Sequence, residues 1–361
     1  MSELGLRGIG AQGLGGASGS MSRDETNVLR LEPGVAAGYY EIYCLMLSAP
    51  ASQLGAWVRY VVQAPPQRPE EGWCELWATV FDSREGGECF GLMREYGLDA
   101  LDPARSPFRL RLGDGQLASG ACDGVLEGGG HRLAWELEIS TPRPPYLPIA
   151  AELYAGDRLP AGYMSPYSAG HFGGWIEIDG RRVELVGASG EQMHIWGRKH
   201  AALSFWAHCC DFDGVDDAEL GLHGADPAAG GSAESAAHLA YLRLGEEEYQ
   251  LLSLVDQSTS HNERGPGWWR ITVESEELRI EAELTWDPAL LVEAEYRDPD
   301  GSAYWVLHHD LCSCEVRLLR RENPNAPWQQ QHRLVSTHTT QGEWGSTRSD
   351  DSVANRVLRL D

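Results

Sequence analysis

Candidate acid–base residues gather in the middle of the chain, between residues 170 and 214. Glu191 and His194 lie just before Trp196 and Gly197, and His208 follows in a short apolar run. An imidazole group titrates near neutral pH, so it can give a proton to a polyene, a quinone or a carbonyl group, or take one back. We therefore expect acid–base chemistry in which His194 or Glu191 protonates or polarises a ligand, with His208 as a further catalytic candidate.

Aromatic side chains alternate along the segments that surround these residues. Trp rings can wall an apolar pocket, and their faces can stabilise positive charge that develops on a substrate. A buried Arg59 is expected to pair with a carboxylate such as Glu41 or Glu75, and this pair either anchors a ligand or is purely structural. The predicted substrate-binding residues are Trp57, Arg59, Trp77, Trp175, Trp196, Trp206 and Tyr304.

The histidines and tryptophans also have a structural interpretation. His194 and Trp196 can close a buried corner between two domains instead of touching a ligand. On the strand that carries Trp206 and His208, alternation places both side chains on one face. It does not decide whether that face lines a cavity or packs against the other domain. The two interpretations stay open at this point.

The sequence offers no recognisable cofactor or metal motif. Its eight cysteines lie mostly in strand-like apolar runs, and the Cys209/Cys210 and Cys312/Cys314 pairs are spaced too closely for an ordinary zinc site. Motifs typical of serine hydrolases, phosphate-binding loops, dinucleotide-binding folds and zinc proteases are absent. We therefore expect reduced thiols, no metal and no cofactor.

Charge and hydropathy exclude several classes of partner. The 361 residues carry a formal net charge of −25, which lacks the basic footprint of a nucleic-acid-binding protein and disfavours anionic membranes. No stretch is long and apolar enough for a membrane span, and no secretory signal is apparent, so a cytoplasmic location is expected. Residues 1–27 are rich in Gly and Ser and are expected to form a disordered leader.

The hydrophobic pattern predicts an all-β protein. Apolar residues alternate in many short runs separated by turn residues, of which Asp179-Gly180 is the clearest hairpin signal. Apolar residues almost never recur at helical spacing. The number of runs is about twice what one eight-stranded barrel needs, so two antiparallel barrels or sandwiches are expected in tandem, with little helix. The predicted domains are residues 28–200 and 201–361.

The order of several motifs resembles the two-domain lipocalin-like family that includes tocopherol cyclase, hydroxyneurosporene synthase (a carotenoid hydratase) and fungal Diels–Alderase-type cyclases. The resemblance covers roughly residues 37–320. Relatives often carry an Asp directly before the His-x-Trp-Gly run, whereas this chain has Met193 there. The motifs that carry the resemblance are Tyr39-Tyr40-Glu41, Trp57-Val58-Arg59-Tyr60, Leu76–Asp82, Gly173–Arg182 and His194-Ile195-Trp196-Gly197.

This resemblance implies a function. It suggests a cofactor-independent cyclase or hydratase of secondary metabolism that acts on an apolar isoprenoid, polyene or polyketide-like substrate. A non-catalytic carrier of such a hydrophobic molecule is the alternative, and a structural partner protein is a third possibility that exposed Trp patches would support.

Overall fold

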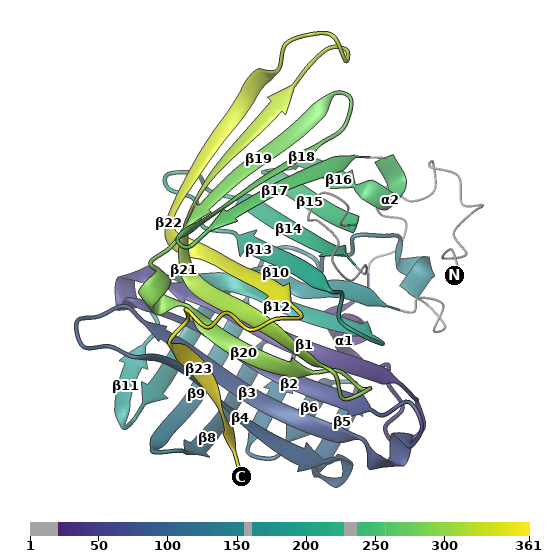
Figure 1. Cartoon of the computed structure of the whole chain (residues 1–361), viewed down its shortest axis with the longest axis vertical. Helices are drawn as coiled ribbons and strands as arrows, with labels where there is room; N and C mark the ends of the chain where they lie inside the picture. The colour runs from purple at the N-terminus through teal and green to yellow at the C-terminus, as the bar shows by residue number, and fades with distance from the viewer. Residues whose placement is uncertain (1–20, 155–160, 227–236, 257) are drawn as a thin grey trace.

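The computed structural model describes residues 21–154, 161–226, 237–256 and 258–361 (Figure 1). Strands dominate these ranges, as the alternating pattern predicts, and the all-β fold class is confirmed. The α-helices among the described residues are α1 (Arg23–Asn27) and α2 (Ser253–Asp256). Neither is long and apolar enough to cross a membrane.

The first sheet is antiparallel and uses the first half of the chain. Its strand order is β4-β3-β2-β1-β12-β10-β9-β8-β7-β6-β5, with β11 added to the far half of β10. The strands are β1 (Tyr39–Ala49), β2 (Leu54–Ala64), β3 (Trp73–Asp82), β4 (Cys89–Gly97), β5 (Leu101–Arg105), β6 (Phe108–Leu112), β7 (Gly115–Ala118), β8 (Ala121–Gly128), β9 (His131–Ser140), β10 (Gly162–Ile178), β11 (Arg181–Glu184) and β12 (Ala188–Gly197).

The second sheet is built in the same way from the following strands. Its order is β16-β15-β14-β13-β22-β21-β19-β18-β17, and β20 pairs with the first half of β21. The strands are β13 (Leu203–Cys209), β14 (Ala218–Asp226), β15 (Ala237–Leu244), β16 (Glu247–Leu252), β17 (Thr259–Gly265), β18 (Trp268–Glu274), β19 (Leu278–Thr285), β20 (Val292–Arg297), β21 (Ala303–Arg320) and β22 (Gln329–Ser346).

The last strand, β23 (Asn355–Leu360), joins the two sheets. It runs parallel to β20 of the second sheet at Asn355 and Arg356, and parallel to β4 of the first sheet from Val357 to Leu360. Figure 1 shows it crossing from one sheet to the other near the C-terminus. The two sheets are therefore linked by backbone hydrogen bonds as well as by side chains.

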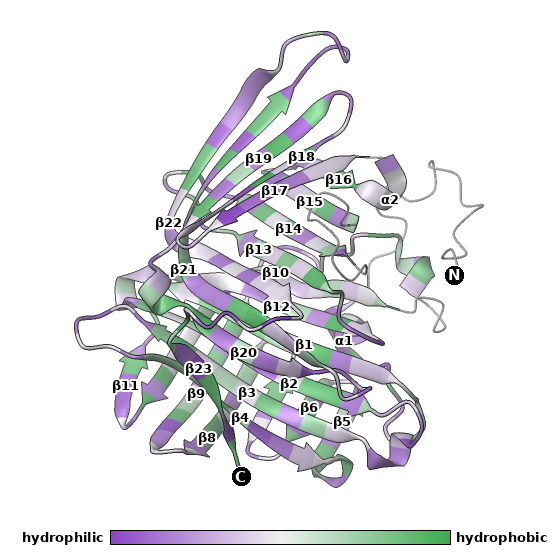
Figure 2. Ribbon diagram, viewed as in Figure 1, coloured by the Kyte–Doolittle hydropathy of each residue, from purple (hydrophilic) through white to green (hydrophobic). Residues whose placement is uncertain are grey.

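Each sheet has an apolar core on one face because its strands alternate in hydropathy, as Figure 2 shows along the ribbons. In the first sheet this face carries Leu45, Val58 and Leu76, and in the second sheet it carries Phe205, Leu220 and Leu242. All of these side chains are buried. The opposite face of each sheet packs against the other sheet.

The layer where the two sheets meet is here called the seam. Alternate residues of β1 to β4, β12 and β13 pack there against β20 and β21. The seam is apolar and rich in aromatic rings. Its buried hydrophobic members are Tyr40, Ile42, Cys44, Met46, Trp57, Val61, Trp77, Phe81, Cys89, Met93, Met193, Trp206, Val292, Ala294, Tyr296, Tyr304, Val306 and Leu311.

The segment before β1 differs from the sequence-based expectation. Disorder is expected through residue 27, yet α1 begins at Arg23 with a capping box between Ser22 and Glu25. The helix is held against the first sheet, since Gln192 donates a hydrogen bond to Asn27 Oδ1 at 2.7 Å. Because the segment is polar, its sequence does not indicate these contacts. Residues 1–20 lie outside the described residues.

Candidate active site

Strand alternation places Glu191 and His208 on the seam from opposite sheets. On β12, Glu191 shares a face with Met193, which belongs to the seam, whereas Gln192 and His194 point to the other face. On β13, Trp206 and His208 face the seam because Phe205 and Ala207 fill the core of the second sheet. Both Glu191 and His208 are fully buried.

Glu191 is held at one oxygen and left free at the other. The Tyr163 hydroxyl of β10 donates a hydrogen bond to Glu191 Oε1. The second carboxyl oxygen, Oε2, has no hydrogen-bond partner among the described residues. An unpartnered carboxyl oxygen in a buried position is unusual and points to a place where water or a ligand group belongs.

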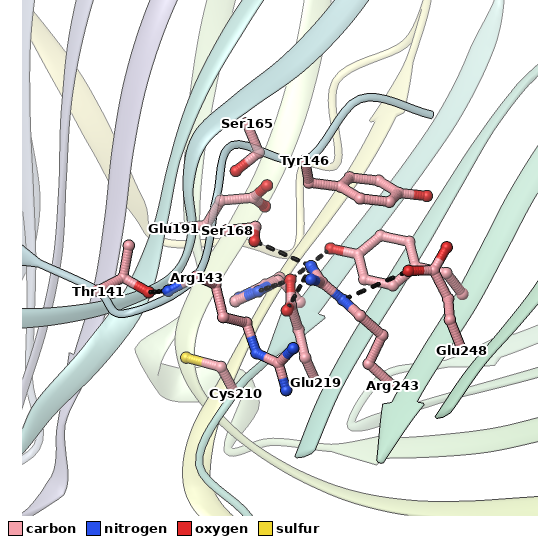
Figure 3. Close-up of polar contacts among 12 residues, drawn as sticks. Thr141, Arg143, Tyr146, Ser165, Ser168, Glu191, Cys210, Glu219, Arg243 and Glu248 are labelled. Atoms are coloured by element: carbon pink, nitrogen blue, oxygen red, sulfur yellow. Dashed lines mark hydrogen bonds and ion pairs between the residues drawn. The ribbon is translucent and has the colours of Figure 1, made fainter. Parts of the chain in front are cut away.

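His208 sits in a network of polar side chains from the second sheet, of which Figure 3 shows Glu219 and Arg243. Its Nδ1–H donates to the amide oxygen of Gln341 at 3.1 Å, and its Nε2 lies 3.6 Å from Glu219 Oε1. Glu219 also accepts from the Tyr241 hydroxyl at 2.9 Å and lies 2.7 Å from Arg243 Nη2. Tyr163, Glu191, His208, Glu219 and Arg243 are here called the acid–base cluster.

Burial and mutual charge set the protonation states of the cluster. Burial raises the pKa of Glu191 to about 7, although His208 and the hydroxyl groups of Tyr163 and, more weakly, Ser165 oppose it. Burial alone would lower the pKa of His208, but the carboxylates of Glu191 and Glu219 outweigh it and the pKa is raised. Burial would likewise raise the pKa of Glu219, but His208 and Arg243 hold it below its usual range. Because each of them shifts the pKa of the other, Glu191 and His208 titrate as a coupled pair.

Two further unpartnered groups lie beside this cluster on the second sheet. The ring of His223 on β14 is tilted against that of Tyr163, with ring centres 4.4 Å apart, and the Trp206 ring lies 6.1 Å from the ring of His208. Neither Trp206 Nε1 nor His223 Nε2 has a hydrogen-bond partner in the described part of the chain. Burial and the charge on His208 lower the pKa of His223 to about 3, so His223 is neutral at pH 7.

A second polar group in the seam surrounds Arg59. The Arg59 guanidinium lies 3.5 Å from the ring centre of Tyr296, and Trp57 and Trp77 pack beside it with ring centres 6.1 Å apart. Three donors here lack a partner within the described residues: Arg59 Nη1, Trp57 Nε1 and the Thr79 hydroxyl. They come from neighbouring positions of β2 and β3, so they can converge on a carbonyl or oxyanion.

Arg59 does not form the ion pair that the sequence suggests. Glu75 accepts hydrogen bonds from the indole N–H groups of Trp73 and Trp77, and Glu41 accepts one from the backbone N–H of Leu31. The arginine instead lies on the Tyr296 ring. Strand alternation puts Arg59 on the seam, but it does not reveal which group of the second sheet lies opposite.

No family model and no curated protein matches the sequence. Among solved structures, an AttH-type protein of Nitrosomonas europaea aligns over 89% of this chain and 98% of its own, with 14% identity and a TM-score of 0.55. CghA in complex with Sch210972 aligns over 90% and 98%, with 11% identity and a TM-score of 0.55.

The chain has a lipocalin-like fold. Both structural relatives are covered almost completely, so the similarity concerns the whole arrangement of strands and not one barrel. The resemblance inferred from the short sequence motifs is thereby confirmed at the level of fold. At such low identity the relatives show the fold alone, and function has to be argued from the side chains.

Within this lipocalin-like fold, most of the residues predicted to bind substrate gather in the seam. Trp57, Arg59, Trp77, Trp206 and Tyr304 all lie there, on strands from both sheets. Of the predicted catalytic residues, Glu191 and His208 lie there as well. These positions agree with one shared site but do not test a role for any residue.

His194 and Trp196 lie on the other face of β12, under α1. His194 Nδ1 is 2.6 Å from the carbonyl oxygen of Thr26, so it donates there, and Nε2 is 2.7 Å from Glu41 Oε1. Both ring nitrogens are thus occupied by protein groups. Trp196 packs near Tyr154 of the same face. This geometry favours the structural interpretation of the pair.

Trp175 lies apart from the seam. It sits on the far half of β10, where its indole N–H donates to Glu136 at 3.2 Å and Arg182 lies over its ring at 4.3 Å. One possible metal-binding group among the described residues, Glu88 with His131 and Asp179, also lies away from the seam at the surface. Asp179 already accepts from the backbone N–H of Arg132 at 2.6 Å.

Sequence reasoning missed Tyr163, Glu219 and Arg243. The segment from residue 218 to 234 is rich in Gly, Ala and Asp and is expected to be a loop, yet β14 runs from Ala218 to Asp226. A usable signal was the alternation of Glu219, Gly221 and His223 with Leu220 and Leu222. The polar members are buried by the first sheet, which the sequence of the second sheet cannot show.

Proposed function

We propose that the protein is an acid–base cyclase or hydratase for a largely apolar small molecule, with Glu191 as the proton donor. The observation that carries this proposal is the free oxygen of a fully buried carboxyl group whose pKa is raised to about 7. A carboxylic acid with such a pKa is half protonated at neutral pH, which suits it to give and take back a proton in one catalytic cycle.

The proposed mechanism uses the two polar groups of the seam in turn. Arg59, with the N–H of Trp57 and the hydroxyl of Thr79, holds a carbonyl or hydroxyl oxygen of the substrate. Glu191 protonates a double bond or carbonyl, and the electron-poor carbon that results is attacked by another group of the same molecule in a cyclase, or by water in a hydratase. A proton is then lost to the Glu191 carboxylate, which restores the acid. Trp206 stabilises positive charge through its ring face.

Two features of the site support this assignment. His208 lies next to Glu191 and shares its proton equilibrium, while Glu219 and Arg243 hold His208 in place from behind. Glu191 and His208 are also fully buried, and burial away from bulk water strengthens electrostatic stabilisation of a developing charge. CghA, which has the same fold, was solved together with the small molecule Sch210972. An isoprenoid, polyene or polyketide-like substrate, no cofactor and a cytoplasmic location belong to the same proposal.

A non-catalytic carrier of an apolar molecule is the second candidate. The aromatic walls of the seam favour it as much as they favour an enzyme, since rings from both sheets line the layer. The two functions differ in whether they need the acid at Glu191. A carrier needs no buried acid with a raised pKa, and its ligand would leave the protein unchanged.

The test is to identify the small molecules that copurify with the wild-type protein and with Glu191→Gln from the source cells. For an enzyme, the variant retains a precursor that is an isomer of the wild-type ligand, or that differs from it by one water, and purified wild-type protein converts the one into the other. If both proteins carry the same unchanged molecule, the protein is a carrier. The fluorescence of Trp residues in the seam gives an independent measure of binding.

A further inference from the structure

Two adjoining pockets lie within the second sheet and share no residue with the acid–base cluster. The inner pocket has a volume of about 20 Å³, which is room for about one water molecule. Beside it lies a second, outer pocket of about 240 Å³. Arg264, Leu307 and Trp344 line both of them. The inner pocket is otherwise lined mainly by Trp269, Leu284, Trp286, His309 and Cys312, and by Glu343, whose carboxylate lies 3.1 Å from His308 Nδ1.

An irregularity in β21 directs His309 into the inner pocket. Opposite β22, His309 pairs with Gly342 and Cys312 pairs with Thr340, so three residues of β21 span the length of two on β22. Such a bulge reverses the alternation of side chains along the strand. His309 and Cys312 therefore both face the pocket, whereas His308 faces the seam. Gly342, opposite His309, contributes no side chain and leaves the space open.

The inner pocket presents two hydrogen-bond donors. His309 Nδ1 accepts from the backbone N–H of Leu311 at 3.1 Å, so in the neutral ring the proton is on Nε2. His309 is 2% exposed; Trp286 Nε1 has no hydrogen-bond partner among the described residues, and His309 has only a weak further hydrogen bond, to the backbone of Asp287. Burial lowers the pKa of His309 to about 4 against the smaller opposing effect of this hydrogen bond, so the ring is neutral at pH 7.

The outer pocket has a different character. It is lined by the rings of Trp305 and Trp344, with the Arg264 guanidinium over the Trp344 ring at 5.3 Å. The hydroxyls of Ser346 and Ser349, which also line it, donate to the carbonyl oxygen of Arg348 and to Glu293. Its charged residues are two arginines, Arg264 and Arg348, against three carboxylates, Glu293, Asp350 and Asp351. The excess of carboxylates disfavours an anionic ligand and suits hydroxyl groups, which donate hydrogen bonds to carboxylates.

We propose that these two pockets form a ligand site for a flat, hydroxylated aromatic ketone. Its carbonyl group enters the inner pocket and accepts hydrogen bonds from His309 Nε2 and Trp286 Nε1. Its ring lies against Trp344 in the outer pocket, and its hydroxyl group faces the carboxylates. The site takes no part in the proposed reaction at Glu191. This proposal therefore does not depend on the proposed function.

Equilibrium dialysis of three matched probes tests this site. The probes are 4-hydroxyacetophenone, 4-ethylphenol, which lacks the carbonyl, and 4-acetylbenzoate, in which a carboxylate replaces the hydroxyl group. We expect the wild-type protein to bind 4-hydroxyacetophenone about 10-fold more tightly than either of the others, as a hydrogen bond to a buried donor allows. His309→Asn keeps an oxygen that can accept from the N–H of Leu311 but loses the donor at Nε2. We therefore expect this variant to bind 4-hydroxyacetophenone no more tightly than 4-ethylphenol.

Further variants locate the probe. Gly342→Val fills the inner pocket and should weaken 4-hydroxyacetophenone at least 10-fold, while the melting temperature confirms that the variant folds. Glu191→Gln should leave the affinity for this probe unchanged. The proposal is overturned if the wild-type protein binds the ketone and 4-ethylphenol equally, if His309→Asn keeps the preference, or if Glu191→Gln weakens the ketone, which would place the probe in the seam.

Discussion

The protonation of Glu191 links the stability of the protein to pH. Its pKa rises from an ordinary value of 4.5 in the unfolded chain to about 7 in the native protein. Between these two values the native state binds more protons than the unfolded state, so stability falls as the pH rises. The raised pKa of His208 acts in the same direction, because its contribution is complete below 6.5 and is lost as the pH rises through the native pKa.

We therefore expect the Glu191 carboxyl alone to contribute a fall of roughly 1 kcal/mol per pH unit between pH 5 and pH 7, seen as the difference in slope between the wild-type protein and Glu191→Gln, because the lowered pKa values of His223 and His309 act in the opposite direction over this range. Urea denaturation at several pH values measures this slope. Glu191→Gln should flatten it, because the amide does not titrate, whereas Glu246→Gln at an exposed position should leave it unchanged. Equal slopes in the wild-type protein and in Glu191→Gln would show that Glu191 titrates normally.

Arg243 offers a second prediction at the same scale. It lies 2.7 Å from Glu219, a fully buried carboxylate, and donates a hydrogen bond to Ser168 at 3.0 Å. Arg243→Met would leave the charge of Glu219 uncompensated, so we expect a loss of about 3 kcal/mol of unfolding free energy. Adding Glu219→Gln should recover part of the loss. Additive losses in the double variant would contradict direct coupling of the two residues.

The sequence predicts side-chain faces better than it predicts side-chain partners. Alternation correctly groups Trp57 with Arg59, and Trp206 with His208, because a strand has a strict period of two. It cannot show that Arg59 meets Tyr296, or that Glu191 meets His208, since each of these pairs joins two sheets. Partners across the seam depend on how the sheets dock.

At the scale of elements, β12 and α1 depend on each other through His194. This side chain connects the carbonyl oxygen of Thr26 to the carboxylate of Glu41, and Glu41 also accepts from the backbone N–H of Leu31. Glutamine cannot reach both partners, so His194→Gln should lose about 1–3 kcal/mol of unfolding free energy. Hydrogen exchange of the backbone near residues 26–31 should speed up.

Catalysis decides between the two interpretations of His194. If the structural one holds, turnover per folded molecule stays within a few-fold of the wild-type value. A fall of about 100-fold in turnover at unchanged stability would instead make His194 the general acid. Chemical denaturation and a substrate-conversion assay on the same sample separate the two outcomes.

Some elements could not be located from the sequence. Residues 153–168 are expected to be irregular, yet β10 begins at Gly162 and its pairing with β12 shifts register twice before Gly170. Such shifts break the alternation on which strand prediction depends. A register shift also lies between His309 and Cys312 on β21, so the sequence does not show that these two side chains share a face.

At the scale of the whole molecule, the seam should make the two sheets unfold together. It buries aromatic side chains from both sheets, and β23 adds backbone hydrogen bonds to both. We expect one calorimetric transition whose van't Hoff and calorimetric enthalpies agree. Two separate transitions would show that the seam contributes little to stability.

The position of β23 also has a consequence for how the chain is made. Residues 91–94 of β4 emerge from the ribosome early, but their parallel partners, residues 357–360, are synthesised long afterwards. Until then β4 presents an unpaired edge, and the space against Gly128 that Leu360 will occupy stays empty. We therefore expect the nascent first sheet to be prone to pairing with other chains at this edge until its last strand arrives.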